Sequence, residues 1–489
     1  MGERKILNSF MIVTVGQTVS YALSFLRNLI LARMLTRADY GLAATFALAV
    51  GMLELTSKLA VGQQVVQAKE GDSTAFLSTA HSFQLIAGAI SSGLLLVTCI
   101  PMAHLFKVPE KTWAFALVAL VPLFKGLFHL DCVRRQRHFE FLPSISVDLV
   151  PQVIVTALAW PMAAWIGDYR VVLVLLLGKE LLTLLMARGV AQHPYRLGWD
   201  RAQVHRMWNF GWPLILNGFF MFAAGQGDQL LVGSGYSLEV LALYAAGASL
   251  IAAPFMIMAG GMSSILLPLL SRHQEDPVRF RREYKDYVLL TAIGAMVTML
   301  PLVLAGEQIL KLLYGSKYAG GGMVMAWLAA AHAFWFLRMV PSIAAMARAD
   351  TQNQMISNLF RLSYLPLVLL AVLLGASVAT VAACAVFGQL AALVASAWRL
   401  KRRQSVPLSD TFRPAAYLGA CLAVAGVSIM LGAHQWHLVA AVGVSALLCV
   451  CALASAFRLF HESMRRLWQG LSPVLFRRVP LVQGKIAGK

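Results

Sequence analysis

Charged side chains are scarce in this chain. Only 13% of its 489 residues are Asp, Glu, Lys or Arg, whereas soluble domains carry about 25%. The apolar residues form runs of roughly 18 to 25, the length that a helix needs to cross the ~30 Å hydrocarbon core of a bilayer. These runs do not alternate with polar residues as the strands of a membrane barrel do. The sequence therefore predicts an all-α polytopic membrane protein.

The motifs of several enzyme classes are also missing. No Gly-Lys-Ser or Gly-Lys-Thr triplet of a Walker loop occurs, which argues against ATP as the direct drive. There is no His-Glu-x-x-His, and the six cysteines lie in or beside apolar runs without metal-ligand spacing or a disulfide pattern. We therefore expect neither a metal nor a cofactor, and a transporter in preference to an enzyme.

Basic residues mark the expected topology. We expect fourteen spans, at 10–31, 41–61, 79–102, 112–130, 143–166, 170–187, 210–232, 240–270, 287–305, 321–345, 357–376, 379–398, 414–432 and 436–458. If the N-terminus is cytoplasmic, the even-numbered connections and both tails hold about four times as many Lys and Arg residues as the opposite side. This bias predicts two cytoplasmic termini. It explains the net charge of +19 without a nucleic-acid partner.

The chain also shows signs of internal duplication. Residues 35–43 and 236–244 each join an apolar helix to the next through a short loop with one acid. Parallel repeats of this kind suit the rocking of two lobes around a central cavity. We predict a six-helix N-terminal lobe (1–190), a cytoplasmic linker (191–209), a six-helix C-terminal lobe (210–400), two additional transmembrane helices (401–460) and a basic cytoplasmic tail (461–489).

Ionisable side chains interrupt the apolar spans. They are Arg27, Glu54, Lys58, Lys125, Asp148, Lys179, Glu180, Asp228, His332, Arg338 and Arg361. Each is costly in hydrocarbon, so such residues usually face a water-filled cavity or one another. Their number predicts a polar pathway through an otherwise apolar protein, as in a transporter.

Two segments resemble a known family. Residues 25–41, FLRNLILARMLTRADYG, closely resemble the N-terminal signature of polysaccharide-transport proteins, the Wzx-type flippases of lipid-linked oligosaccharides. These belong to the multidrug/oligosaccharidyl-lipid/polysaccharide exporter superfamily. Residues 227–233 with Leu243-Tyr244 resemble the family's seventh-span pattern, although Ala242 stands where glycine is usual.

The resemblance implies a multi-pass protein of the bacterial inner membrane. Such a protein moves undecaprenyl-diphosphate-linked oligosaccharide repeat units from the cytoplasmic to the periplasmic leaflet, for exopolysaccharide, capsule or O-antigen (lipopolysaccharide) synthesis. We expect it to work by alternating access. Its expected partners are the lipid-linked cargo, membrane lipids, and polysaccharide polymerase and export proteins.

A polar face on the first span leads the candidate substrate site. Gln17, Ser24 and Arg27 recur at helical spacing. We expect Arg27 to meet the diphosphate, because a guanidinium forks onto phosphate oxygens. The alternative is a buried ion pair that joins two helices. The further cavity candidates are Lys125, Lys179, Trp335 and Arg338.

Three acids, Asp228, Glu180 and Glu54, are candidates for ion coupling or gating. Asp228 is the repeat-equivalent of Arg27, and we expect the two to pair in one transport state and separate in another, the alternative being a permanent pair. Lys179 and Glu180 are adjacent, so each needs a partner on another helix. Arg361 starts its span and is expected at the membrane interface.

Two other functions compete with the flippase. A multidrug/cation antiporter of the same superfamily calls for a cavity dominated by acids and aromatics, whereas the bases in these spans are at least as numerous as the acids. A membrane polymerase or ligase of lipid-linked sugars is expected to carry a large outer loop with catalytic residues. The longest outer connection expected here spans only about residues 306–320.

Overall fold

The computed structural model describes residues 3–57, 61–430 and 438–466, and every regular element in these ranges is helical. The helices of the first half are α1 (Glu3–Met34), α2 (Arg37–Ser57), α3 (Val61–Gln67), α4 (Thr74–Leu105), α5 (Thr112–Val118), α6 (Leu120–Gly126), α7 (Asp131–Arg134), α8 (Leu142–Ile166) and α9 (Arg170–Val190). Short 3-10 turns occupy Pro109–Lys111 and Arg135–His138.

The second half of the chain is also helical in its described residues. Its helices are α10 (Arg201–Gly235), α11 (Leu238–Arg272), α12 (Pro277–Leu304), α13 (Gly306–Tyr314), α14 (Gly322–Ala347), α15 (Gln352–Arg361), α16 (Tyr364–Leu373), α17 (Val378–Gln404), α18 (Ser409–Met430) and α19 (Leu438–Leu459). A 3-10 turn at Ser316–Tyr318 follows α13.

The helices confirm a polytopic membrane fold. Within the described ranges, nine helices are long and apolar enough to cross a membrane, or ten if the bent pair Pro109–Gly126 and Asp131–His138 is one span. In the described residues, each of the fourteen expected spans falls on one helix or on two consecutive helices; residues 58–60 of the second span, 431–432 of the thirteenth and 436–437 of the fourteenth lie outside the described residues. Two of these spans are broken, at α5–α6 and at α15–α16.

Local sequence sets where several helices begin. Asp200, Ser237, Asp276 and Ser377 precede α10, α11, α12 and α17, and each side chain accepts a hydrogen bond from a backbone N–H of the first turn. These bonds satisfy donors that have no partner inside the helix. The polar residues between apolar runs therefore fix the ends of the long helices.

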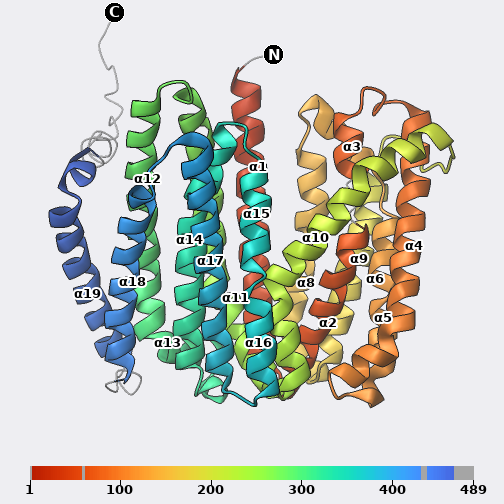
Figure 1. Cartoon of the computed structure of the whole chain (residues 1–489). Helices are drawn as coiled ribbons and strands as arrows, with labels where there is room; N and C mark the ends of the chain where they lie inside the picture. The colour runs from red at the N-terminus through yellow and green to blue at the C-terminus, as the bar shows by residue number, and fades with distance from the viewer. Residues whose placement is uncertain (1–2, 58–60, 431–437, 467–489) are drawn as a thin grey trace, which may run out of the picture.

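The helices form two groups with a shared centre (Figure 1). In one group α14 packs against α11, α12 and α17, and α18 and α19 pack on α12. In the other group α4 packs against α5 and α6, and α8 packs between α1 and α9. Between the groups, α2 contacts both α10 and α11. The central cavity therefore lies where helices of both halves meet.

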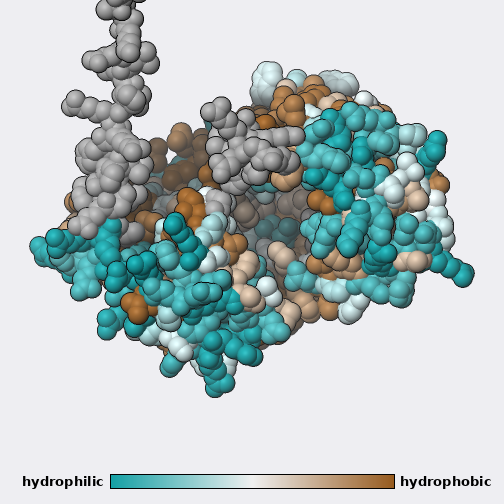
Figure 2. Space-filling view, turned by 90° about the horizontal axis from the view of Figure 1, so that it is seen from above, coloured by the Kyte–Doolittle hydropathy of each residue, from teal (hydrophilic) through white to brown (hydrophobic). Residues whose placement is uncertain are grey.

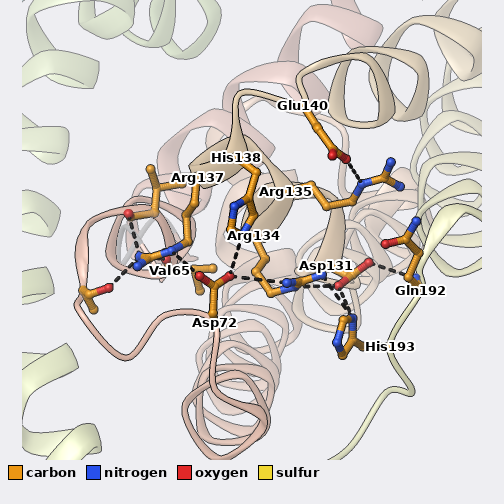
Figure 3. A network of polar contacts seen from close by, with 12 residues as sticks. Val65, Asp72, Asp131, Arg134, Arg135, Arg137, His138, Glu140, Gln192 and His193 are labelled. Atoms are coloured by element: carbon orange, nitrogen blue, oxygen red, sulfur yellow. Dashed lines mark hydrogen bonds and ion pairs between the residues drawn. The ribbon is translucent and has the colours of Figure 1, made fainter. Parts of the chain in front are cut away.

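The expected linker at 191–209 is only partly non-helical, because α10 begins at Arg201. Its first residues are bound to the first group of helices. Asp131 accepts a hydrogen bond from the Gln192 backbone N–H (2.9 Å) and contacts the His193 ring (3.0 Å), as Figure 3 shows. Further along, Arg206 of α10 pairs with Glu70 at 2.9 Å.

The basic segment at 134–137 belongs to the same network (Figure 3). Arg134 donates to Asp131 (2.9 Å) and to Asp72 (3.3 Å), and Arg137 donates to Asp72 (3.2 Å). Burial raises the pKa of the Asp72 carboxyl, but the hydrogen bond from His138 and the charge and hydrogen bond of Arg137 outweigh it, and the net effect is a lower pKa. This basic segment, expected from charge alone as a cytoplasmic loop, also holds three connections together.

Candidate functional site

A cavity of about 650 Å³ lies at the centre of the molecule, with walls from both halves of the chain. Its polar and aromatic walls carry Arg27, Gln226, Asp228, Gln229, His332, Trp335, Arg361, Tyr364 and Gln389. From the face where α1 begins, a hollow opens between two masses of side chains, and hydrophilic residues gather on both masses (Figure 2). The molecule is therefore hollowed from one face toward its centre.

Two arginines supply the positive charge of this cavity. Arg27 comes from α1 and Arg361 from the end of α15, so each half of the chain contributes one. In the described part of the chain, neither guanidinium has a carboxylate within ion-pair distance or a hydrogen-bond acceptor. Each guanidinium carries five N–H donors and stands in the wall of a space that an anion can occupy.

The acid of the cavity is held differently. Asp228 is buried, accepts a hydrogen bond from the Tyr244 hydroxyl at 2.6 Å and another from the Gln229 backbone N–H at 2.9 Å. It forms no ion pair with Arg27, although both line the same cavity. The expected pair of Arg27 and Asp228 is not formed in this conformation, and its formation in another state stays a prediction.

An aromatic cluster forms one wall. Trp335 and His332 lie one turn apart on α14, with ring centroids 6.2 Å apart, and both pack near Phe255 of α11. The His332 Nδ1 lies 2.9 Å from the Leu328 carbonyl oxygen of the preceding turn. Trp335 therefore lies at the central cavity, and its role in substrate binding stays a prediction.

Arg338 lies elsewhere. It is buried, and its Nη1 donates to Ser357 Oγ at 2.8 Å and to Asn358 Oδ1 at 3.1 Å. These bonds join α14 to α15, and Arg338 is not part of the cavity lining. Arg338 follows Trp335 by about one turn of α14, but its side chain enters the packing between α14 and α15. Sequence periodicity alone does not distinguish this side of the helix from the side that faces the cavity.

The candidates Lys125, Lys179 and Glu180 line a second, smaller cavity of about 330 Å³ in the first half of the chain. Lys179 lies 3.9 Å from Asp148 of α8, and Lys125 of α6 lies 3.8 Å from Glu180. As expected, the adjacent residues Lys179 and Glu180 find partners on different helices. None of the three lines the central cavity in this conformation.

The remaining candidates lie on α1 and α2. Gln17 is exposed and Ser24 is half-buried, and neither lines the central cavity. Ser20, on the same face of α1, donates to Asp148 at 2.9 Å, so this face meets α8. The side chain of Glu54 lies outside the described residues, and its gating role stays a prediction.

Sequence reasoning missed several cavity residues. Arg361, expected at the membrane interface, lines the central cavity because the span breaks between α15 and α16 at this point. Gln226, Gln229 and Gln389 also line it. The signal for Gln226 and Gln229 was present, since both flank Asp228 within an apolar span.

The cavity is closed at the end opposite the hollow. Arg33 at the end of α1 donates to the carbonyl of Leu312 (3.1 Å), and Arg37 at the start of α2 donates to those of Lys317 (3.2 Å) and Glu239 (3.0 Å). Lys317 returns a hydrogen bond to the Arg33 carbonyl at 3.0 Å. These bonds, here named the lower closure, join the two halves of the chain.

Solved structures show a similar fold. A lipid II flippase MurJ in an inward closed conformation matches with a TM-score of 0.72 and 13% identity, over 92% of this chain and 99% of that chain. An inward-facing multidrug resistance MATE family transporter of the MOP superfamily matches with a TM-score of 0.61 and 14% identity, over 81% and 96%. An outward-facing transporter of that description matches with a TM-score of 0.52 and 13% identity, over 84% and 98%.

The family is established by sequence. No curated protein matches this chain significantly. A family model described as polysaccharide biosynthesis protein matches residues 30–321, which is more than half of the chain and includes walls of the cavity from both halves. With its membrane-spanning helices and a fold shared with lipid and drug transporters, the chain belongs to this polysaccharide biosynthesis protein family.

Proposed function

We propose that this protein is a flippase for undecaprenyl-diphosphate-linked oligosaccharide repeat units. It moves them from the cytoplasmic to the periplasmic leaflet for the synthesis of exopolysaccharide, capsule or O-antigen. The observation that carries the proposal is the pair of arginines, Arg27 and Arg361, which face one cavity from the two halves of the chain without a carboxylate partner in the described residues.

The charge of the cavity favours an anionic cargo. Two guanidinium groups face one buried carboxylate, Asp228, whose oxygens already accept two hydrogen bonds. Arginine binds phosphate oxygens in a bidentate geometry, which suits a diphosphate. The lipid chain stays in the bilayer, so only the polar headgroup needs this aqueous cavity.

The conformation fits one half of an alternating-access cycle. The hollow opens on the face where the basic segment 134–137 lies, and the lower closure seals the opposite end. Basic loops are retained on the cytoplasmic side of membranes. We therefore infer that the structure is open to the cytoplasm of a bacterium, with both termini on that side of the inner membrane, and that the predicted lobes 1–190 and 210–400 rock about the cavity.

A multidrug/cation antiporter is the nearest alternative, because MATE transporters share the fold. A cationic drug requires an excess of negative charge in the cavity, and the described lining shows the opposite. A polymerase or ligase of lipid-linked sugars is less well supported, since the expected outer connection at 306–320 holds only α13 and the 3-10 turn Ser316–Tyr318 as regular elements. Polysaccharide polymerase and export proteins remain the expected partners.

The test is leaflet assignment of the lipid-linked repeat unit in depleted cells that express wild-type protein or Arg27→Ala. Labelling from the periplasmic side should fall in both the depleted and the Arg27→Ala cells, while total lipid-linked sugar stays constant or rises. Protein level by immunoblot is the control. Unchanged outward-facing lipid-linked sugar on depletion contradicts the flippase, and drug-efflux assays then test the antiporter.

A further inference from the structure

The second cavity has a lining unlike that of the central one. It lies between α4, α6, α8 and α9, inside the first half of the chain. Two lysines, two acids and two aromatic rings contribute to its walls: Lys125, Lys179, Asp148, Glu180, Phe124 and Phe128. Its formal charge is balanced, whereas the central cavity has an excess of arginine. The two cavities are therefore suited to different parts of a ligand.

One helix connects the two cavities. On α9, Val172 and Leu176 line the central cavity, and Glu180 and Thr183 line the second. These residues follow at intervals of three or four, so they share one face of the helix. The helix rises about 5 Å per turn, which places the two cavities about one turn apart along α9. An elongated ligand in the central cavity would have to extend by about one helical turn along this face to reach the second cavity.

The ion pairs in the second cavity are loose. The Lys179–Asp148 and Lys125–Glu180 distances are 3.9 Å and 3.8 Å, longer than the ~2.8 Å of a charge-assisted hydrogen bond. The Asp148 and Lys179 side chains are 57% and 25% exposed, so both remain accessible. Closely spaced donors and acceptors of this kind match the hydroxyl groups of a sugar, each of which both donates and accepts.

The aromatic rings complete this match. Phe124 and Phe128 offer apolar faces beside the charged groups, and a sugar ring has an apolar C–H face as well as polar edges. A site with a few fixed polar groups among aromatic walls is typical of small-molecule recognition. Balanced charge gives no net attraction to a diphosphate, so the polyhydroxylated part of the cargo is the better ligand.

We propose that the second cavity binds the sugar portion of the lipid-linked cargo, neutral or zwitterionic, while Arg27 and Arg361 hold the diphosphate. This inference rests on the proposed flippase function and adds a glycan subsite to it. Lys179, Asp148, Lys125 and Glu180 are the recognising groups. Selectivity among repeat units then depends on this cavity, and affinity for the carrier lipid depends on the central one.

The test compares two probes on the purified full-length protein: undecaprenyl diphosphate, and the lipid-linked repeat unit extracted from depleted cells. Thr183→Trp fills the second cavity, because the half-buried Thr183 lines it. Its matched control is Leu181→Trp, two residues away and 42% exposed outside the cavity. Thr183→Trp should raise the Kd for the repeat unit about tenfold or more, the scale of one lost hydrogen bond to a charged group, and leave that for undecaprenyl diphosphate within about twofold.

A second variant, Asp148→Asn with Lys179→Met, removes one ion pair without changing the net charge. It should produce the same selective loss. Equal weakening of both probes, or no weakening of either, contradicts the glycan subsite. Equal affinity of the wild-type protein for both probes also contradicts the glycan subsite, but it does not contradict the proposed flippase function. Failure of wild-type protein to bind either probe removes the flippase and the subsite together. If the variant with Asp148→Asn and Lys179→Met loses the sodium or proton dependence of transport while it binds both probes as wild type does, the second cavity is a cation site. This result overturns the inference.

Discussion

Arg338 and Arg361 are both arginines within apolar spans, yet the structure gives them different surroundings. Arg338 donates to Ser357 and Asn358 in the packing between α14 and α15. Arg361 lines the central cavity without an ion-pair partner in the described chain. The two residues therefore allow a comparison between a packing role and the proposed cargo-binding role.

We expect Arg361→Gln to raise the Kd for undecaprenyl diphosphate by about 10-fold to 100-fold, because a hydrogen bond to a charged group contributes about 1.5–3 kcal/mol. The thermal stability of Arg361→Gln should change little. Arg338→Gln should instead lower the melting temperature, since it disrupts buried hydrogen bonds, and leave the Kd nearly unchanged. Binding titrations and thermal unfolding of the two purified variants check this contrast. If the two variants changed the Kd equally, the predicted difference in role between Arg338 and Arg361 would be wrong.

Gly41 lies at the lower closure, at the start of α2. A Cβ at this position would clash with the backbone carbonyl of Leu238, at the start of α11. Backbone atoms cannot move aside as a flexible side chain does, so the two halves must separate here to admit a methyl group.

We therefore predict that Gly41→Ala opens the lower end and shifts the population away from the present conformation. In the Gly41→Ala background, Tyr40→Cys, at a residue buried at this closure, should react faster with a membrane-impermeant thiol reagent applied to the side of the lower closure, after subtraction of the reaction of the native cysteines. Gly93→Ala is the control, because a Cβ there meets nothing within 4 Å. An unchanged labelling rate would show that the closure adapts without opening.

At the scale of elements, α13 and α14 are joined through one acid. Glu307 of α13 accepts hydrogen bonds from the backbone N–H groups of Gly320 (2.8 Å) and Gly322 (2.7 Å) and pairs with Lys311 at 3.0 Å. Burial raises the pKa of Glu307, but these contacts outweigh it and hold the pKa below its ordinary value of 4.5. The carboxylate therefore satisfies donors at the start of α14 in its charged form.

A pKa that is lower in the folded state stabilises the protein above the unfolded pKa, and the contribution is lost as the pH falls through the folded value. We expect the melting temperature of the purified protein to decrease below about pH 4.5 in part for this reason. Glu307→Gln should lower the melting temperature at pH 7, by the equivalent of about 1–3 kcal/mol in the free energy of unfolding. It should also reduce the further decrease of the melting temperature below about pH 4.5. Glu110→Gln, at an exposed acid of the 3-10 turn Pro109–Lys111, is the control. If the melting temperature of Glu307→Gln decreased at acid pH as much as that of wild type, the decrease would be due to other groups.

One helix, α10, contacts helices of both groups. Residues 192–200 and the start of α10 are bound to the first group of helices, through Asp131 and through Glu70. The far end of α10 meets α16, where the Tyr364 hydroxyl donates to the Ala224 carbonyl at 3.2 Å. α10 thus connects the two groups, and the relative motion of the lobes, which stays a prediction, acts on this helix.

At the scale of the whole molecule, the lower closure holds the two halves together at one end. Arg37 and Lys317 are in direct contact across it, through the Lys317 carbonyl at 3.2 Å. We predict that Arg37→Cys with Lys317→Cys, joined by a cleavable bifunctional thiol reagent, stops translocation. Cleavage of the linker should restore it, because the reagent blocks only the opening of this end.

The native cysteines, including the exposed Cys451, require the reagent to be applied to wild-type protein as well. Each single cysteine variant serves as a second control. Translocation that continues in the cross-linked protein would contradict alternating access through this end, and it would favour a pathway that leaves the two halves in contact.

The sequence by itself determined the membrane fold, because helix length and apolarity are local properties set by the thickness of the bilayer. It also singled out Arg27 and Trp335 as cavity candidates and Asp228 as a gating candidate, because ionisable and aromatic side chains in apolar spans stand out without a structure. All three line the central cavity, and their roles stay predictions. The sequence also required separate partners for Lys179 and Glu180, because neighbouring residues on a helix point in different directions.

Only the tertiary structure decided which polar residues share a cavity. Arg361 reaches it through the break between α15 and α16, whereas Arg338 turns into the packing between helices. The separation of Lys125 and Lys179 into a second cavity likewise depends on how α6 and α8 pack beside α9. These outcomes depend on helix rotation and on contacts between residues far apart in the chain, which a periodic pattern within one span does not specify.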